Sequence, residues 1–299
     1  ALGIRSKNGR PIVARLPMPR HLSHPSRAVA LLFLLLIAAG TLLLKLPVSH
    51  ASGESAPLLV ALFTAVSAVC VTGLVVVDTG TYWSPFGQVV VMALFQMGGF
   101  GLMTAAALLG LLVNRSLRLR TRLLTQAESH TIGLGDVTSV ARVVLVVTMV
   151  CELALAAVLA TRFAMSHAMP WSDALWSGLF HAVSAFNNAG FSLYGDSLMR
   201  FQSDAWVLLP VMLAIFIGGI GFPVLQDIRG RWSDPHHWSL HTKLTLSGSA
   251  LLLVMGMAGL LVFEWTNTGT LGAMGPGDKL LNAAFASVSA RTAGFNSVD

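Results

Sequence analysis

The strongest constraint in this sequence is a set of long apolar runs. Five of them reach the length of roughly 20 residues that a helix needs to cross a bilayer. They cover residues 27–46, 85–113, 137–160, 205–225 and 244–263. Only 11% of the residues are charged, against about 25% in soluble domains, so the chain lacks the polar surface to cover these runs in water. The sequence therefore predicts an all-α polytopic membrane protein and excludes a soluble globule.

Three further apolar stretches are too short to span. They cover residues 56–69, 171–186 and 279–290, and each is followed by a polar turn that contains glycine. Helices of this length in a membrane protein are buried, interfacial or re-entrant. Re-entrant backbone is tolerated only where protein buries it or water lines it. The alternation of long, short and long segments predicts repeated helix–pore-loop–helix units around a central ion pathway.

The short segments match one another in sequence, which supports an internal repeat. FTAVSA (63–68), FHAVSA (180–185) and FASVSA (285–290) occupy equivalent places, and Gly73, Gly190 and Gly294 follow their serines by 6, 6 and 5 residues. A Gly-Gly pair recurs at 98–99 and 218–219, an offset of 120 residues against 117 for the first two serines. Two independent motifs therefore recur at nearly the same offset along the chain.

The repeat predicts six segments along the chain. They are a basic cytoplasmic N-terminal segment (1–26), a first repeat (27–113), a cytoplasmic loop (114–136), a second repeat (137–226), a second cytoplasmic loop (227–243) and an incomplete third repeat (244–299). The chain stops just after a polar motif, so we expect a fragment.

The distribution of positive charge predicts the orientation. With a cytoplasmic N-terminus, 14 of the 19 Lys and Arg residues fall on the inner side, in segments 5–27, 115–142 and 229–243. This agrees with the positive-inside rule. The net charge of +6 is thus explained by topology, and no nucleic-acid partner is expected. The two cysteines sit in apolar runs and form no disulfide framework.

The three glycine turns indicate a cation pathway. A helix that enters from outside and ends at mid-membrane directs its partial negative charge toward the centre. The turn that follows can offer backbone carbonyls in place of hydration water. The motifs contain no side-chain ligand cage and no nucleophile–base pair, so we expect a monovalent cation and no enzyme. Three interfacial helices with ordinary turn glycines are the alternative.

These motifs resemble the Trk/Ktr/HKT superfamily of potassium transporters, and within it the KtrB/NtpJ-type membrane subunits. The resemblance rests on VSAVCVTGLVVVD (66–78), VSAFNNAGF (183–191) and SARTAGFN (289–296), together with QMGGFG (96–101) and SLHTK (239–243). It implies four repeats around one pore, of which this chain holds two and a half. It also implies a homodimer, cytosolic nucleotide-binding KtrA-type regulatory subunits, and a multi-pass location in the cell inner membrane.

The resemblance also implies which residues line the ion path. K⁺ would be held by backbone carbonyls of a selectivity filter formed by Cys70, Val71, Thr72, Gly73, Asn187, Asn188, Ala189, Gly190, Arg291, Thr292, Ala293 and Gly294. Asp78, Asp196 and Asp299 would form an external mouth that concentrates cations, although solvated turns or helix caps explain them equally well.

Several single residues carry two interpretations. Asn187 and Asn188 either brace the filter by hydrogen bonds or contribute oxygens to an ion, and bracing is favoured. Arg291 is expected to point away from the path and to pair with Glu264 or Glu152. His181 is expected to be packed and neutral. The Gly-Gly helices, with Gly101 and Gly221, are expected to allow close contact with the pore helices, or alternatively to act as hinges.

The predicted function is potassium uptake by the ion-translocating subunit of a Ktr/Trk-like system. No cofactor is expected beyond the transported K⁺, with sodium stimulation or symport as a property of the family. The alternative is a non-conducting membrane scaffold subunit with a degenerate pore. Intact glycines in all three turns favour conduction.

Overall fold

The computed structural model describes residues 25–101, 104, 134–230 and 232–298, and helices dominate this part of the chain. The long helices are α1 (Pro25–Leu44), α5 (Leu134–Ser166) and α9 (Leu240–Glu264). The shorter ones are α2 (Leu58–Val69), α3 (Thr79–Tyr82), α6 (Trp171–Phe186), α7 (Ala205–Ile220), α8 (Phe222–Gly230) and α10 (Pro276–Thr292). Residues 85–101 are also helical. An isolated antiparallel β-bridge joins His50 to Trp83. The predicted all-α membrane fold class is confirmed.

Each predicted short segment forms a helix that begins at a proline. Pro57 and Pro170 directly precede α2 and α6, and Pro276 is the first residue of α10. Proline suits this position because its fixed φ matches the helix and the first-turn amides have no partner within the helix. The three helices are 12, 16 and 17 residues long, shorter than a span.

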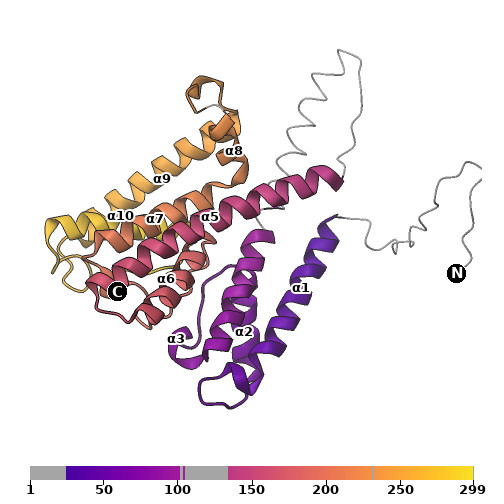
Figure 1. Ribbon diagram of the computed structural model, residues 1–299. Helices are drawn as coiled ribbons and strands as arrows, with labels where there is room; N and C mark the ends of the chain where they lie inside the picture. Colours follow the sequence, from indigo (N-terminus) through magenta and orange to yellow (C-terminus); the bar gives the residue numbers. More distant parts are fainter. Residues whose placement is uncertain (1–24, 102–103, 105–133, 231, 299) are drawn as a thin grey trace, which may run out of the picture.

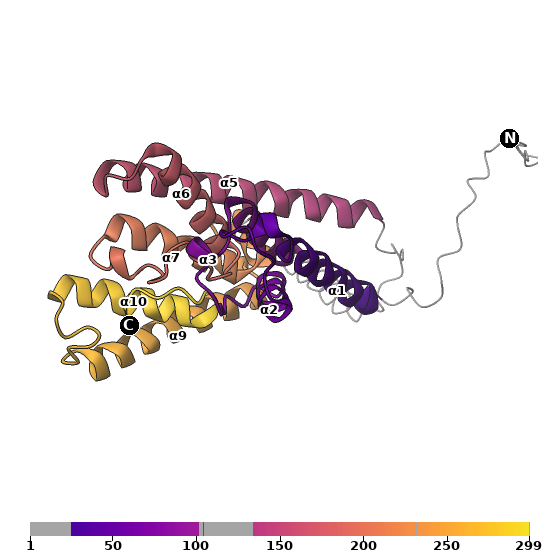
Figure 2. The ribbon, with the colours of Figure 1, turned by 90° about the horizontal axis from the view of Figure 1, so that it is seen from below.

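The helices pack in the order that the repeat predicts. Figures 1 and 2 show α5 beside α6 and α9 beside α10, and α1 contacts α2 in the same way. Helix α7 contacts both α6 and α10, so it links the second repeat to the third. Each short helix is thus held by the long helix that precedes it.

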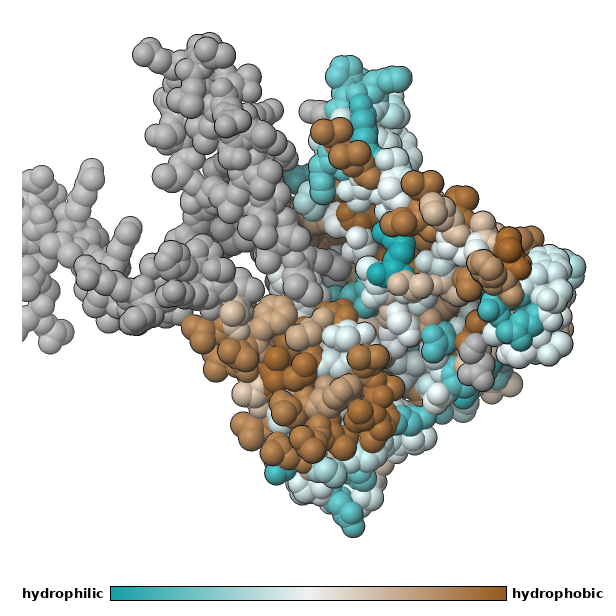
Figure 3. All heavy atoms as spheres, turned by 180° about the vertical axis from the view of Figure 1, so that it is seen from behind, coloured by the Kyte–Doolittle hydropathy of each residue, from teal (hydrophilic) through white to brown (hydrophobic). Residues whose placement is uncertain are grey.

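Two described helices are long and apolar enough to cross a membrane, and a bent pair supplies a third if it counts as one span. The two are Ala141–Ser166 and Leu240–Glu264, and the pair is α7 with α8. The apolar part of α1, Ala30–Leu44, is shorter than a span, and the predicted run 85–113 extends outside the described residues. Figure 3 shows a broad apolar patch where α1 and α2 lie. Both helices expose large apolar side chains, among them Leu34, Leu35 and Leu59, as expected for a lipid-facing surface.

The predicted continuous run 205–225 is wrong in one respect. The helix breaks at Gly221, and α7 and α8 meet at 94°. Gly221 has φ +83°, a conformation that residues with a Cβ rarely adopt, and Pro223 then lies in the first turn of α8. Of the glycines expected to permit close packing, Gly221 instead ends a helix. Among the described residues, a Cβ on Gly101 would meet only the Phe33 ring, at an ordinary contact distance of 3.6 Å.

Gly98, Gly99 and Gly218 do permit close packing, whereas a Cβ on Gly219 would make only ordinary contact, 3.6 Å from Thr292 Oγ1. A Cβ on Gly98 would overlap the carbonyl of Val69, the last residue of α2. A Cβ on Gly218 would likewise overlap the carbonyl of Phe186, the last residue of α6. The second helix of each of these repeats therefore touches the end of its own short helix backbone to backbone.

We expect Gly218→Ala to destabilise the protein because the added methyl group has no room. Overpacking of this kind costs about 1–3 kcal/mol, which would lower the melting temperature by about 3 °C or more. Gly259→Ala is the matched control, since no described atom outside the neighbouring turns of α9 lies within 4 Å of its Cβ position. Thermal unfolding in detergent, followed by gel filtration, measures both. Equal losses in the two variants would contradict the packing argument.

Candidate functional site

The segments after α2, α6 and α10 close with the same backbone hydrogen bond. In each, the amide five residues after the motif serine donates to the carbonyl of that serine. The pairs are Thr72 to Ser67 (2.8 Å), Ala189 to Ser184 (2.8 Å) and Gly294 to Ser289 (3.3 Å). This bond turns the chain sharply away from the helix end. The three predicted loops therefore share a local structure.

Left-handed backbone follows in all three loops. Gly73, Gly190 and Gly294 have φ of +79°, +70° and +75°. The first two loops hold a second such residue, Val71 (φ +55°) and Asn188 (φ +58°), and the third loop, one residue shorter, does not. Non-glycine residues at positive φ are strained and persist only where the surroundings hold them.

The three glycines lie next to one another in chain order. A Cβ on Gly73 would overlap the carbonyl of Ala189, and a Cβ on Gly190 would overlap the carbonyl of Ala293. A Cβ on Gly294 would meet nothing closer than 3.9 Å, where Thr72 O and Gly190 Cα lie. The structure thus brings together the three predicted loops, with backbone against backbone between neighbours. Helices α2, α6 and α10 all end at this point.

The motif serines have a role that the sequence analysis did not assign. The hydroxyl of Ser184 donates to the carbonyl of Phe191 (2.8 Å), and that of Ser289 donates to the carbonyl of Phe295 (2.6 Å). Each bond ties the residue after the glycine back to the short helix. The Ser67 hydroxyl is buried without a partner in the described part of the chain. The recurrence of this serine in all three motifs was the available signal.

The two asparagines of the second loop are buried and hydrogen-bonded to protein. The Asn187 amide nitrogen donates to Gln96 and Glu152. The Asn188 amide fits its surroundings when its nitrogen donates to Thr292 Oγ1 (2.8 Å) and its oxygen accepts from the Gly219 amide (3.2 Å). These contacts agree with the bracing interpretation of both side chains.

Arg291 does not contact the carboxylates that the sequence analysis expected. Its guanidinium donates to the Ser249 hydroxyl at 3.1 Å and lies over the Phe216 ring at 5.8 Å. Glu264 instead accepts from Asn267 and Thr270, outside the end of α9. The expectation of a Glu264 or Glu152 partner was wrong because α9 presents Ser249, a full 15 residues before Glu264, to the end of α10.

The acidic residues after the loops already have protein partners. Asp78 caps α3 by accepting from the amides of Gly80 (2.8 Å) and Thr81 (3.0 Å). Asp196 pairs with Arg200 at 2.7 Å, and the hydrogen bond from this guanidinium lowers the pKa of the Asp196 carboxyl. Asp299 lies outside the described residues. The cap and ion-pair roles explain Asp78 and Asp196 without a bound cation.

His181 is packed as expected. Its ring is fully buried, contacts Ser177 O (2.7 Å) and Ser192 Oγ (2.9 Å), and stacks on Tyr194. It therefore connects α6 to the chain that follows the second loop.

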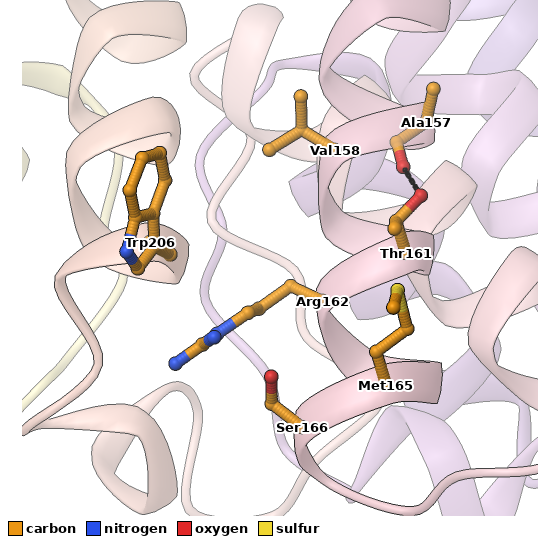
Figure 4. A pocket seen from close by; sticks show the side chains of 7 residues that line it. All are labelled: Ala157, Val158, Thr161, Arg162, Met165, Ser166 and Trp206. Atoms are coloured by element: carbon orange, nitrogen blue, oxygen red, sulfur yellow. Dashed lines mark hydrogen bonds between the residues drawn. The ribbon is translucent and has the colours of Figure 1, made fainter.

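A separate open cavity of about 520 Å³ lies between α5 and α7 (Figure 4). Val158 and Met165 line it with Trp206, and Arg162 points into it. Arg162 is paired with Asp204 at 2.8 Å. None of the lining residues belongs to the three loops, so the cavity is distinct from the candidate site.

The chain is similar in sequence to several known proteins. The chain is 42% identical over 92% of its length to the Ktr system potassium uptake protein B of Bacillus subtilis, covering 61% of that protein. It is 38% identical to the protein of the same name from Vibrio alginolyticus, over 91% of this chain and 59% of that one. It is 36% identical to the potassium/sodium uptake protein NtpJ of Enterococcus hirae, over 92% and 60%. The chain thus spans about three fifths of the length of these relatives.

The fold is also similar to a solved structure, the potassium transporter TrkH from Vibrio parahaemolyticus. The TM-score is 0.62 at 19% identity, with 93% of this chain and 53% of that chain covered. A family model for TrkH, described as a cation transport protein, matches residues 13–299. With nearly the whole chain matched, the protein belongs to the TrkH family of cation transport proteins.

Proposed function

We propose that this chain forms the larger part of a subunit that takes up K⁺ across the cell membrane. In this proposal the ion is coordinated by backbone carbonyls of the three glycine loops and of whatever completes the ring. The observation that carries the proposal is the direct contact of these loops in chain order, with a left-handed glycine in each. Three relatives named as potassium or potassium/sodium uptake proteins support it.

The electrostatics of the loops favour a cation. The C-terminal ends of α2, α6 and α10 carry the partial negative charge of their helix dipoles. Carbonyl oxygens suit K⁺ because they replace water in its hydration shell. The filter residues in this proposal are those of segments 70–73, 187–190 and 291–294. Their side chains serve mainly to shape the backbone.

The scaffold alternative requires a degenerate pore. Degeneration would be expected to replace one of the three glycines or to fill the space between the loops. All three glycines keep φ near +75°, so conduction is the better supported function.

The assembly follows from the same resemblance. We propose a multi-pass subunit of the cell membrane with its N-terminus in the cytoplasm, which pairs with a second copy and with KtrA-type nucleotide-binding subunits. The name "Ktr system" of two relatives supports a system of several components. Sodium stimulation is proposed from the relative named for both ions.

In the complete transporter, we expect Gly73→Ser and Gly190→Ser to raise the half-saturation concentration for Rb⁺ by about tenfold or more. Each new serine must keep the left-handed backbone of the glycine that it replaces. Its Cβ would also overlap a carbonyl of the neighbouring loop. Loss of about 1.4 kcal/mol of coordination free energy gives this factor. Gly294→Ser should have a smaller effect, because only the backbone strain applies. Rb⁺ uptake with Na⁺ as competitor measures all three.

Cys70→Ala is the control for these variants. It keeps the carbonyl and removes only an exposed thiol, so the half-saturation concentration should change by less than about threefold. A severe effect of Cys70→Ala beside unchanged affinity in the three glycine variants would show that side chains form the site.

The proposed orientation predicts which loops a membrane-impermeant maleimide can reach. Gly277→Cys, at the start of α10, should be labelled on intact cells, and Gly230→Cys, at the end of α8, only after permeabilisation. At both positions the new Cβ would have no atom of the described, non-adjacent residues within 4 Å, so the two substitutions are matched. Cys70 and Cys151 are first replaced by alanine. Labelling of residue 230 from outside would reverse the topology.

A further inference from the structure

A buried polar cluster lies behind the second loop, where the first repeat meets the second. It consists of Glu152 on α5, Asn187 at the end of α6, and Gln96 on the helix that covers 85–101. Glu152 is 2% exposed and Asn187 is 4% exposed, while Gln96 is half-buried. Three elements from two repeats therefore place polar groups in one small volume.

The three side chains form a closed set of hydrogen bonds. The Asn187 amide nitrogen donates to Glu152 Oε1 at 2.9 Å and to Gln96 Oε1 at 2.5 Å. The Gln96 amide nitrogen donates to Glu152 Oε2 at 3.1 Å. Each carboxylate oxygen of Glu152 thus accepts one hydrogen bond from an amide. The Gln96 amide takes part through both atoms, since its nitrogen donates to Glu152 and its oxygen accepts from Asn187.

The Asn187 side chain is held by more acceptors than it can satisfy at once. Its nitrogen has two hydrogens, yet the Val183 carbonyl also lies at 2.9 Å. Its oxygen is buried without a partner in the described part of the chain. The Gly99 backbone packs against this side chain, since a Cβ there would overlap it. The amide is therefore confined on several sides and is not free to turn toward an ion.

Glu152 has no cationic partner among the described residues, although it is nearly fully buried. Burial of a carboxyl group without a cation is costly, and apolar packing would fill the space at least as well. Simple packing therefore does not account for this residue. What distinguishes Glu152 is its pair of oxygens, which hold groups from two different repeats.

We propose that Glu152 is a positioning residue for ion selectivity, and that it sets the second filter loop against the first repeat through Asn187 and Gln96. Displacement of Asn187 would move Ala189, two residues further along the loop, whose carbonyl lies against Gly73 of the first loop. This inference rests on the proposed function, because it concerns the selectivity of that same pathway.

The other side of the second loop is held by a separate contact of the same kind. The Asn188 amide bridges Thr292 of the third loop (2.8 Å), the Ile215 carbonyl of α7 (3.1 Å) and the Gly219 amide (3.2 Å). Successive asparagines thus fasten this loop to the repeat before it and to the repeat after it. The first of these fastenings alone depends on a carboxylate.

The test uses the complete transporter and a side-chain exchange. Glu152→Leu removes both acceptors, Glu152→Gln removes the carboxylate, and Gln96→Glu places a second carboxylate about 3 Å from the first. The double variant Gln96→Glu/Glu152→Gln restores one carboxylate and one amide with their places exchanged. Thr161→Val is the control on α5, because its hydroxyl bonds only the Ala157 carbonyl within the same helix.

We expect each single variant at these two positions to weaken discrimination of Rb⁺ against Na⁺ by about tenfold, the effect of a lost hydrogen bond to a charged group. The double variant should recover to within about threefold of wild type. Thr161→Val should match wild type. The measurements are Rb⁺ uptake with Na⁺ competition and the amount of folded protein by gel filtration.

Two results would overturn the proposal. One is lower protein yield with unchanged discrimination in the single variants, since that indicates packing alone. The other is a double variant no better than the worse single variant, since that indicates a role for the charge at position 152 itself. If Glu152→Leu does not fold, the comparison of the double variant with Gln96→Glu and Glu152→Gln still tests the proposal.

Failure of the proposed function gives a different result. Wild-type protein would then take up no Rb⁺, while the thermal stability of the four variants in detergent could still be compared. Recovery of stability in the double variant would support the hydrogen-bonded junction, and additive losses would refute it.

Discussion

The candidate site depends on backbone approaching backbone with no side chain between. The carbonyls of Ala189 and Ala293 occupy the positions where a Cβ of Gly73 and Gly190 would be, so each loop can touch the next only because a glycine is there. The same kind of contact occurs at the ends of the short helices, where Gly98 and Gly218 pack against the last carbonyls of α2 and α6. Shape at this centre is therefore set by the absence of side chains. A ring of carbonyls around a cation requires such an arrangement, because side chains would fill the path.

The short helices make this approach possible. Each ends abruptly because the amide five residues beyond the motif serine turns back to the serine carbonyl. In the second and third repeats the serine hydroxyl then donates a hydrogen bond to the residue that follows the glycine, and so holds the segment that leaves the loop. Each loop glycine therefore lies close to the C-terminal end of its short helix, where the partial negative charge of the helix dipole is located. Polar contacts of Asn187 and Asn188 hold the second loop to both neighbours, at the expense of burying Glu152.

Much of this arrangement could be predicted, because its signals are local. Apolar length separates spans from short helices, and the repeated serine and glycine mark each loop at nearly constant spacing. One error occurred where the partners are distant in sequence, and another occurred where a local helix break does not change the hydropathy. Arg291 bonds Ser249 rather than Glu264, and the apolar run after Ala205 breaks at Gly221, where hydropathy alone shows no interruption. Asp78 and Asp196 were expected either at an external mouth or in solvated turns and helix caps. Asp78 caps α3, and Asp196 pairs with Arg200, a partner that was not expected.

The sequence by itself determined the membrane fold class, the repeat and the positions of the three loops. The length of each apolar run, the repeated motif and the presence of glycine are all properties of short segments. Only the tertiary structure decided which loop touches which, and that Glu152 and Gln96 meet at Asn187. Gln96 is separated by 56 positions from Glu152 and by 91 positions from Asn187, and many other polar groups in the sequence could have taken their place. The choice among them was made by the packing of helices around a common centre, because a buried polar group must bond whatever that packing brings within reach.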